Sequence, residues 1–255
     1  MIICDYSILN FSGIRIQNHK TMAYSIPIGC YTMTVRPSLG SGAFGAVYKA
    51  KHNETGEVVA VKELNSEFMR ESFEHELDII KRLQNHQHIV RLIDHIITQT
   101  NCYLIMEFCD LNHLEDYFKK NPTLDQQKRI ELMKQSADGL AYIHTQSPPI
   151  VHRDIKPTNL LMKTESGNAI VKIDDFGVSK LFESQMQTSL HTDCGTEYYK
   201  APEFFSFGDE GLRYKSGVDV YALGLVFAEM MRFGAGSMQF LPLSGKCSFI
   251  KVCFL

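Results

Sequence analysis

The chain has 255 residues, of which 44% are apolar and 22% charged, so it is long enough for one large domain or two small lobes. A net charge of −3 argues against nucleic acid and against an anionic membrane as partners. Seven irregularly spaced cysteines without a C-x-x-C pair argue against a disulfide framework and a zinc site, so we expect reduced thiols in the cytoplasm, with the nucleus as the alternative.

Residues 1–33 show no clear periodicity, and we expect either an extension or an extra edge strand there. Residues 1–10 lack a basic start and a sustained apolar stretch, so no secretory signal is expected. From residue 34 to about residue 97 the sequence pattern predicts mainly short strands. Strands are expected at residues 47–50, 58–61, 89–97 and 102–108, with a turn at 53–56.

One helix interrupts these strands. Ser66 is its expected N-cap, and an apolar stripe follows at helical spacing, made of Met69, Phe73, Leu77, Ile80 and Leu83. After Asp110 helices predominate, at residues 112–120, 125–144 and 218–231. The last is apolar nearly all round, so we expect it to be buried on every side. The order is a strand-rich lobe, a linker and a helical lobe, and ligands often bind between such units.

A glycine-rich segment, GSGAFGAV, occupies residues 40–47. By itself a G-x-G-x-x-G pattern fits a dinucleotide fingerprint or a flexible turn equally well. A dinucleotide loop opens a helix, whereas here the third glycine enters a strand pattern, so we expect the loop to cap a hairpin. A Walker loop is excluded because no Gly-Lys-Ser/Thr follows. Three glycines allow backbone N–H groups to close over a phosphate.

Lys62 ends the apolar sequence VAVK at residues 59–62. Burial of a lysine is costly unless an anion pairs with it, so a buried Lys62 would need an anionic partner. Taken alone, this pattern is more simply interpreted as a lysine at a strand edge whose ammonium group reaches water. The helix that follows supplies an acidic partner. We prefer Glu76, which lies among the apolar stripe, and Glu74 is the nearest competitor.

The strongest signal is IVHRDIKPTNLL at residues 150–161. Phosphoryl transfer needs the side chains that this segment combines. Asp154 can accept the hydroxyl proton, Lys156 can neutralise γ-phosphate charge, and Asn159 offers a metal-ligand oxygen.

A carboxylate follows an apolar strand in VKIDDFG, residues 171–177. Asp175 there can hold Mg²⁺ against phosphates, because hard cations prefer oxygen ligands. Alone, the Asp-Phe-Gly triplet would be read as an ordinary turn.

In this order and spacing, the motifs resemble the eukaryotic protein kinase family, Ser/Thr type, over roughly residues 34–232. The resemblance implies an α+β, two-lobed fold: an antiparallel N-lobe sheet with one helix (34–106), a hinge (107–110) and a mainly helical, partial C-lobe (111–232). We expect the C-lobe to lack its last helices, since 233–255 reads as an atypical tail.

The resemblance also implies the ligands, ATP and Mg²⁺, and the residues that bind them. Lys62 and Glu76 would form the activating ion pair, and Asp154 and Lys156 would act on the transferred phosphate. Asn159 and Asp175 would be the metal ligands. The nucleotide would be held by Gly40, Ser41, Gly42, Ala43, Phe44, Gly45, Val47, Ala60, Lys62, Met106 as gatekeeper, Glu107, Cys109 and Leu161.

Other features implied by the resemblance concern alignment, regulation and substrates. Leu92, Ile80, Phe176 and His152 would stack as a spine, and Asp219 would brace the backbone near His152 and Arg153. Thr196 would contact Asp154 and Lys156, and Thr192 is the expected phosphorylation site for an upstream activating kinase. Lys156, two residues after Asp154, favours Ser/Thr of protein substrates over Tyr as acceptor.

The pattern has two other interpretations. A non-catalytic kinase-like fragment that binds nucleotide or partner proteins is the alternative, because the end of the helical lobe is missing from the pattern. A Rossmann oxidoreductase is excluded, because a strand pattern rather than a helix follows the glycine loop.

Overall fold

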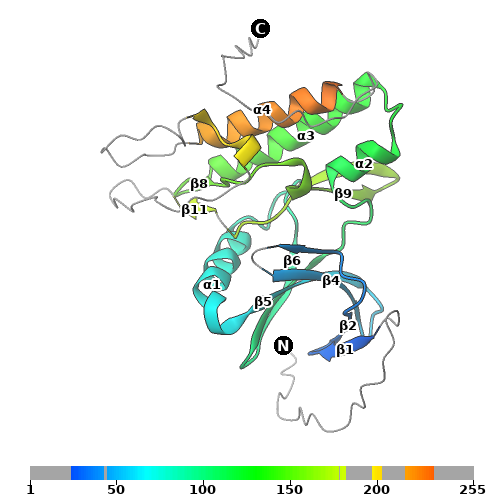
Figure 1. Cartoon of the computed structure of the whole chain (residues 1–255), viewed down its shortest axis with the longest axis vertical. Coiled ribbons are helices and arrows are strands. Elements are labelled where there is room, and N and C mark those ends of the chain that lie inside the picture. Colours follow the sequence, from blue (N-terminus) through cyan, green and yellow to red (C-terminus); the bar gives the residue numbers. More distant parts are fainter. Residues whose placement is uncertain (1–23, 43–44, 178, 182–196, 203–215, 233–255) are drawn as a thin grey trace. The chain divides into compact units, whose positions relative to one another are not determined.

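The computed structural model describes residues 24–42, 45–177, 179–181, 197–202 and 216–232. Figure 1 labels their elements, which in chain order are β1 (Ser25–Ile28), β2 (Tyr31–Thr34), β3 (Gly40–Gly42), β4 (Gly45–His52), β5 (Val58–Asn65), α1 (Ser66–Arg82), β6 (Leu92–Ile97), β7 (Asn101–Glu107), α2 (Leu114–Lys120), α3 (Gln126–His144), β8 (Ile150–Val151), the 3-10 helix η1 (Pro157–Asn159), β9 (Leu160–Glu165), β10 (Asn168–Ile173), β11 (Lys180–Leu181), the 3-10 helix η2 (Glu197–Tyr199) and α4 (Gly217–Arg232).

The chain forms two compact units. The first comprises the residues up to Glu74 together with Arg91–Phe108, and the second comprises His75–Val90 together with the residues from Cys109 onward. One division therefore lies inside α1, and a second lies between Val90 and Arg91. The third lies between Phe108 and Cys109, within the linker expected at residues 107–110.

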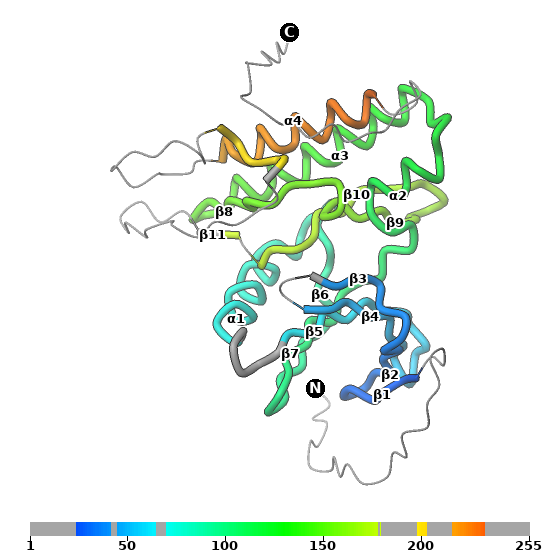
Figure 2. The backbone as a smooth tube through the Cα atoms, viewed as in Figure 1, coloured from blue at the N-terminus to red at the C-terminus, as the bar shows by residue number. Residues whose placement is uncertain are grey.

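An antiparallel sheet builds the first unit, with the strand order β1-β2-β4-β5-β7-β6 and with β3 paired to β4 (Figure 2). Successive side chains of a strand point to opposite faces, and Val59 and Val61 are fully buried on one of them. That face carries the core of the unit, which consists of Ile28, Tyr31, Met33, Ala50, Val59, Val61, Ile96, Tyr103 and Ile105. Together with the helices of the second unit, this sheet confirms the α+β class predicted from the sequence.

The sheet begins upstream of the boundary expected at residue 34. Strands β1 and β2 form a hairpin in which Ile26 pairs with Met33 and Ile28 with Tyr31. Each strand has four residues, which is too short for the alternation of apolar and polar residues to identify it. At the other end of the sheet, β6 starts at Leu92 rather than at residue 89, because Ile89 forms a parallel bridge with Ile173 of the second unit.

Helices α3 and α4 lie side by side in the second unit (Figures 1 and 2). The α3 helix also packs on β10, where a Cβ at Gly139 would lie 3.0 Å from both Ile173 and His88. Arg129 of α3 donates from Nη1 to the Met230 carbonyl at 2.6 Å, near the end of α4. A cation at this position stabilises the negative end of the helix dipole.

The expectation that residues 218–231 are buried on every side is wrong. Buried residues recur along one face of α4, at Val218, Ala222, Val226 and Met230, with Asp219 and Leu223 beside them. Val220 is 55% exposed and Met231 is 47% exposed. The burial therefore follows the helical repeat, which composition alone does not reveal.

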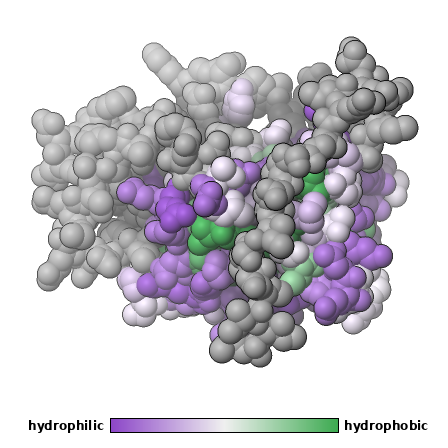
Figure 3. Space-filling model, turned by 90° about the horizontal axis from the view of Figure 1, so that it is seen from below, coloured by the Kyte–Doolittle hydropathy of each residue, from purple (hydrophilic) through white to green (hydrophobic). Residues whose placement is uncertain are grey.

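Hydrophilic residues cover most of the described surface on the face drawn in Figure 3, and apolar residues appear there in smaller areas. Single exposed apolar side chains, such as Val58 and Ile97 of the first unit, are normal for a folded protein. Within the described ranges, no helix combines the length and the apolarity needed to cross a bilayer.

Candidate active site

The glycine-rich segment caps a hairpin, as predicted from the strand pattern that follows it. Gly40 pairs with Val47 and Gly42 with Gly45 across β3 and β4. Gly45 has a φ of +138°, and a Cβ there would lie 2.0 Å from the Glu63 carbonyl oxygen. Only glycine fits at this position. The tip residues Ala43 and Phe44 lie outside the described residues.

Strand register places the predicted nucleotide residues of the first unit on one face of the sheet. Val47 is paired with Lys62, and Ala60 is paired with Met106. Directly paired residues share a face, and so do residues two apart on one strand, so all four side chains lie opposite the core cluster. Lys62 is 8% exposed and Met106 is 3% exposed, so the lysine amine is largely removed from water.

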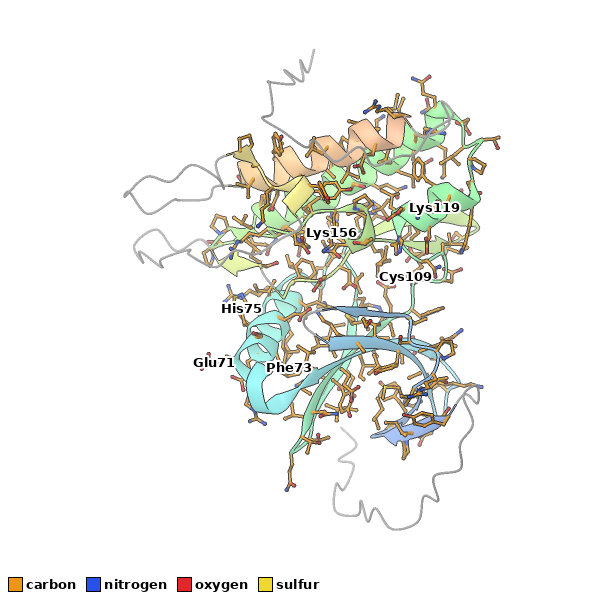
Figure 4. The ribbon with its side chains drawn as sticks, in the orientation of Figure 1. Glu71, Phe73, His75, Cys109, Lys119 and Lys156 are labelled. Atoms are coloured by element: carbon orange, nitrogen blue, oxygen red, sulfur yellow. The ribbon has the colours of Figure 1, made fainter. Side chains whose placement is uncertain are left out.

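Glu107 closes β7 at the end of this face. Its Oε1 accepts the Arg91 backbone N–H at 2.8 Å, and its own N–H donates to the Arg91 carbonyl at 2.9 Å. The side chain therefore fixes the end of the strand, and the predicted nucleotide contact is left to backbone atoms nearby. Cys109 is the first residue of the second stretch of the second unit; its side chain is buried, and it is labelled in Figure 4.

Asp219 of α4 holds the backbone of the segment that carries Asp154. Its Oδ2 accepts the His152 N–H at 2.8 Å, and its Oδ1 accepts the Arg153 N–H at 2.7 Å. The same carboxylate lies 2.8 Å from His144 Nε2. Arg153 has a φ of +71°, a left-handed conformation that a non-glycine residue keeps only when its surroundings stabilise it. The bracing role that the resemblance implied for Asp219 is confirmed.

Three predicted phosphoryl-transfer residues meet on this segment. The Lys156 Nζ lies 2.7 Å from Asp154 Oδ2, and the Asn159 amide nitrogen donates to the same oxygen at 3.0 Å. Asn159 also donates to the Asp154 backbone carbonyl at 2.8 Å. Lys156 is labelled in Figure 4. These contacts fix the direction of the Asp154 carboxylate, and Oδ1 is the atom of the Asn159 amide that could ligate a metal.

The β9–β10 hairpin brings Asn159 next to the Asp174-Asp175 pair. Leu160, the first residue of β9, is paired with Ile173, the last residue of β10, so the residues flanking them meet at one end. The Asp174 N–H donates to the Asn159 carbonyl at 3.0 Å. Asp175 follows with a φ of +66°. Residues far apart in the predicted motifs are thus neighbours through strand pairing.

Gly177 lies against two carboxylates. A Cβ at this position would lie 3.4 Å from Glu76 Oε2 and 3.5 Å from Asp175 Oδ1. Glu76 is 3% exposed, so its carboxylate is buried close to that of Asp175. Two neighbouring carboxylates with little solvent favour a cationic counter-charge.

Phe176 and His152 are fully buried and lie in contact, with ring centroids 5.2 Å apart. His152 Nε2 also pairs with the Asp174 carbonyl at 3.0 Å, which ties the two motifs together. Ile80 is buried in the same unit, whereas Leu92 belongs to the first unit. The complete spine therefore stays a prediction.

The described residues hold no group of three or more His, Cys, Asp or Glu side chains arranged for a metal ion. An amide and a carboxylate are nevertheless a suitable partial ligand set for Mg²⁺, which usually takes one or two protein oxygens and completes its shell with phosphates and water. The residues present therefore fit a metal that arrives with a nucleotide rather than one in an all-protein cage.

Several predicted residues are not brought together. Lys62 lies in the first unit and Glu76 in the second, so their ion pair stays a prediction. Leu161 lies in β9 of the second unit and forms an antiparallel bridge with His113, so its predicted contact with the nucleotide stays a prediction. Thr192 and Thr196 lie outside the described residues, as does the tail from residue 233.

One half-buried pair is not predicted from the sequence. Tyr199 donates to both carboxylate oxygens of Glu229, at 3.1 and 3.0 Å, and Tyr199 lines a small pocket together with Asp154. Burial is the main cause that raises the pKa of Glu229 to about 6, and the nearby Glu115 acts in the same direction. A glutamate within an otherwise apolar helix was the signal that could have identified this pair.

Comparison with known proteins relates this geometry to a family. A model of the protein kinase domain matches residues 33–239. The chain is 34% identical to Calcium/calmodulin-dependent protein kinase cmkB of Emericella nidulans, over 74% of this chain and 46% of that protein. It is 37% identical to Serine/threonine protein kinase OSK3 of Oryza sativa subsp. indica, over 73% of this chain and 37% of that protein. It is 34% identical to Serine/threonine-protein kinase atg1 of Dictyostelium discoideum, over 80% of this chain and 30% of that protein. The chain spans less than half the length of these relatives.

Proposed function

Because this chain belongs to the protein kinase domain family, we propose that it binds Mg·ATP and transfers the γ-phosphate to a Ser or Thr hydroxyl of another protein. The observation that carries the proposal is the arrangement of Asp154, Lys156 and Asn159 on one braced segment, with Asp175 brought alongside by the β9–β10 hairpin. Such transfer depends on positioning and on charge stabilisation, which these side chains supply.

Asp154 would be the general base. Lys156 and Asn159 hold its carboxylate from two sides, so the oxygen that faces an acceptor hydroxyl has a fixed direction. The ammonium of Lys156 would also move onto the γ-phosphate when nucleotide is present, because a phosphate oxygen carries more negative charge to neutralise. Asn159 would then keep Asp154 oriented through its amide.

Asn159 Oδ1 and the Asp175 carboxylate would hold Mg²⁺. The metal supplies positive charge to the phosphates when it is bound. The burial of Glu76 near Asp175 adds negative charge at this point and so favours a cation there.

The first unit would contact the base and phosphates of the nucleotide. Its glycine hairpin offers backbone N–H groups, and Val47, Ala60 and Met106 offer an apolar face for the adenine ring. Lys62 shares that face and would pair with phosphate oxygens.

Further parts of the proposal concern partners and location. The names of the relatives support protein substrates with Ser or Thr acceptors. An upstream kinase acting on Thr192 is a proposed partner, and the cytoplasm or nucleus is the proposed location.

A pair of measurements on the purified full chain tests this function. Thermal unfolding with and without Mg·ATP measures binding, and a ligand at a hundred times its Kd is expected to stabilise the chain by about 2.7 kcal/mol. Transfer of label from γ-labelled ATP to a mixed protein acceptor measures catalysis, and Asp154→Asn is expected to lower its rate by about 10²–10⁴-fold. Stabilisation by nucleotide with no transfer would instead support a non-catalytic binding protein, and an equal rate in Asp154→Asn would overturn the assignment of the base.

A further inference from the structure

His75 of α1 binds the segment that follows Asp175. Its Nε2 lies 2.6 Å from the Ser179 carbonyl oxygen, and a carbonyl only accepts, so Nε2 carries the hydrogen and donates it. Figure 4 labels His75 on α1. Both residues belong to the second unit, although 104 positions separate them in the chain. The proposed phosphate transfer assigns no role to either of them.

Ser179 is a junction between segments of the second unit. It is 1% exposed, so each of its polar groups needs a partner inside the fold. Its N–H donates to the Phe176 carbonyl at 3.0 Å, and its Oγ donates to the His152 carbonyl at 3.3 Å. The His75 ring satisfies the remaining group, the carbonyl oxygen. Removal of the ring would therefore take the donor away from a buried acceptor.

The next residue of α1 reaches the same segment at a second point. A Cβ at Gly177 would lie 3.4 Å from Glu76 Oε2 and 3.5 Å from Asp175 Oδ1. His75 and Glu76 are consecutive, so one turn of the helix meets the segment both at Ser179 and beside the carboxylate of Asp175.

Asp175 has a backbone conformation that needs support from outside. Its φ is +66°, and a non-glycine residue keeps this left-handed conformation only when its surroundings stabilise it. The hydrogen bond from Ser179 to Phe176 closes a turn directly after Asp175, and β11 begins at the residue after Ser179 and pairs with β8. A contact that holds Ser179 therefore also limits the movement of Asp175.

We propose that His75 is a positioning residue for phosphate transfer: its hydrogen bond to Ser179 holds the segment from Asp175 to Ser179 on α1 and thereby fixes the carboxylate of Asp175. The hold on the segment does not depend on the proposed function, whereas its effect on transfer rests on that function.

Amide hydrogen exchange of the nucleotide-free full chain tests the hold without an assay of activity. His75→Leu removes the donor and is expected to raise the exchange rate of the Ser179 amide about tenfold, because a buried carbonyl loses its partner. The Met162 amide, which donates at 2.7 Å in β9, is expected to keep its rate. His75→Gln places an amide N–H about where Nε2 lies, so it is expected to restore wild-type exchange at Ser179. Asp78→Asn, which removes an exposed carboxylate of α1, is the matched control and should change this exchange less than about twofold.

The rate of phosphate transfer as a function of Mg²⁺ concentration tests the effect on the site. His75→Leu is expected to raise the Mg²⁺ concentration for half-maximal rate by about tenfold, the lower limit of what the loss of a residue that supports a metal ligand costs. His75→Gln is expected to return it to the wild-type value. A mere loss of folded protein would instead lower the rate by the same factor at every Mg²⁺ concentration.

Equal exchange of the Ser179 amide in wild type and His75→Leu would overturn the proposal, and so would raised exchange with an unchanged Mg²⁺ dependence in an active chain. If His75→Leu does not fold, His75→Asn replaces it, because its amide reaches the position of Nδ1 and not that of Nε2. A wild-type chain that transfers no phosphate would refute the proposed function, and exchange at Ser179 would then still decide whether His75 holds the segment.

Discussion

Replacing Asp219 by Asn should destabilise the second unit, because this carboxylate accepts two backbone N–H groups at 2.8 and 2.7 Å. An asparagine keeps one accepting oxygen and turns an NH₂ group toward the other donor. The change removes a charge-assisted hydrogen bond and leaves a buried N–H without an acceptor, since the residue is 1% exposed. The two losses together cost about 2–4 kcal/mol, which is a large share of the ~5–15 kcal/mol of a typical domain.

Urea unfolding of the full chain at neutral pH measures this loss, with Val220→Thr as the matched control. Val220 is the next residue of α4 and is 55% exposed, so its substitution is expected to change the free energy of unfolding by less than about 0.5 kcal/mol. A value for Asp219→Asn within about 0.5 kcal/mol of wild type would refute the reasoning that this carboxylate braces the segment of Asp154.

Three other substitutions have expected outcomes. Gly45→Ala should lower the free energy of unfolding by about 1–3 kcal/mol, because its Cβ would lie 2.0 Å from the Glu63 carbonyl oxygen. Gly40→Ala is the control, because a Cβ at Gly40 meets open space. In the same urea titration it should lower the free energy of unfolding by less than half as much. Glu229→Gln tests the carboxyl whose pKa is raised from 4.5 to about 6. The raised pKa means that the folded chain favours the neutral acid. The contribution of this group to folding stability is therefore complete below pH 4.5 and is lost as the pH rises through about 6. A rise from 4.5 to about 6 corresponds to ~2 kcal/mol at 1.36 kcal/mol per pKa unit, and we take half of it because the group is partly exposed. The variant should therefore unfold like wild type near pH 4 and be more stable than wild type near pH 8 by about 1 kcal/mol. Equal stability near pH 8 would contradict the raised pKa. Lys62→Met should reduce the rate of phosphate transfer by about 10²–10³-fold in steady-state assays. It should not lower the unfolding midpoint of the nucleotide-free chain. An unchanged rate would contradict the assignment of Lys62 to the site.

The sequence predicted those parts of the fold that have long repeats or distinctive turns. The α1 stripe led to a helix that starts at Ser66, and the three glycines led to the β3–β4 hairpin. An extra edge strand before residue 34 was one of two expectations, but the β1–β2 hairpin itself was not predicted, because each of its strands has only four residues. The exposed side of α4 was also missed, because an apolar sequence does not tell which face meets α3.

The candidate site followed from order and spacing, but its internal contacts did not. The pairing of Leu160 with Ile173 explains why Asn159 and Asp174 meet, and no local pattern specifies that register. The contact between Tyr199 and Glu229 joins η2 to α4 across 30 residues.

The most direct test of the proposed activity is phosphoamino-acid analysis of an acceptor protein after incubation with the purified chain, Mg²⁺ and γ-labelled ATP. The proposal predicts label on serine or threonine, and it predicts that Asp154→Asn removes at least about 99% of that label. Label confined to tyrosine would contradict the acceptor class, and equal labelling by wild type and Asp154→Asn would contradict the site itself.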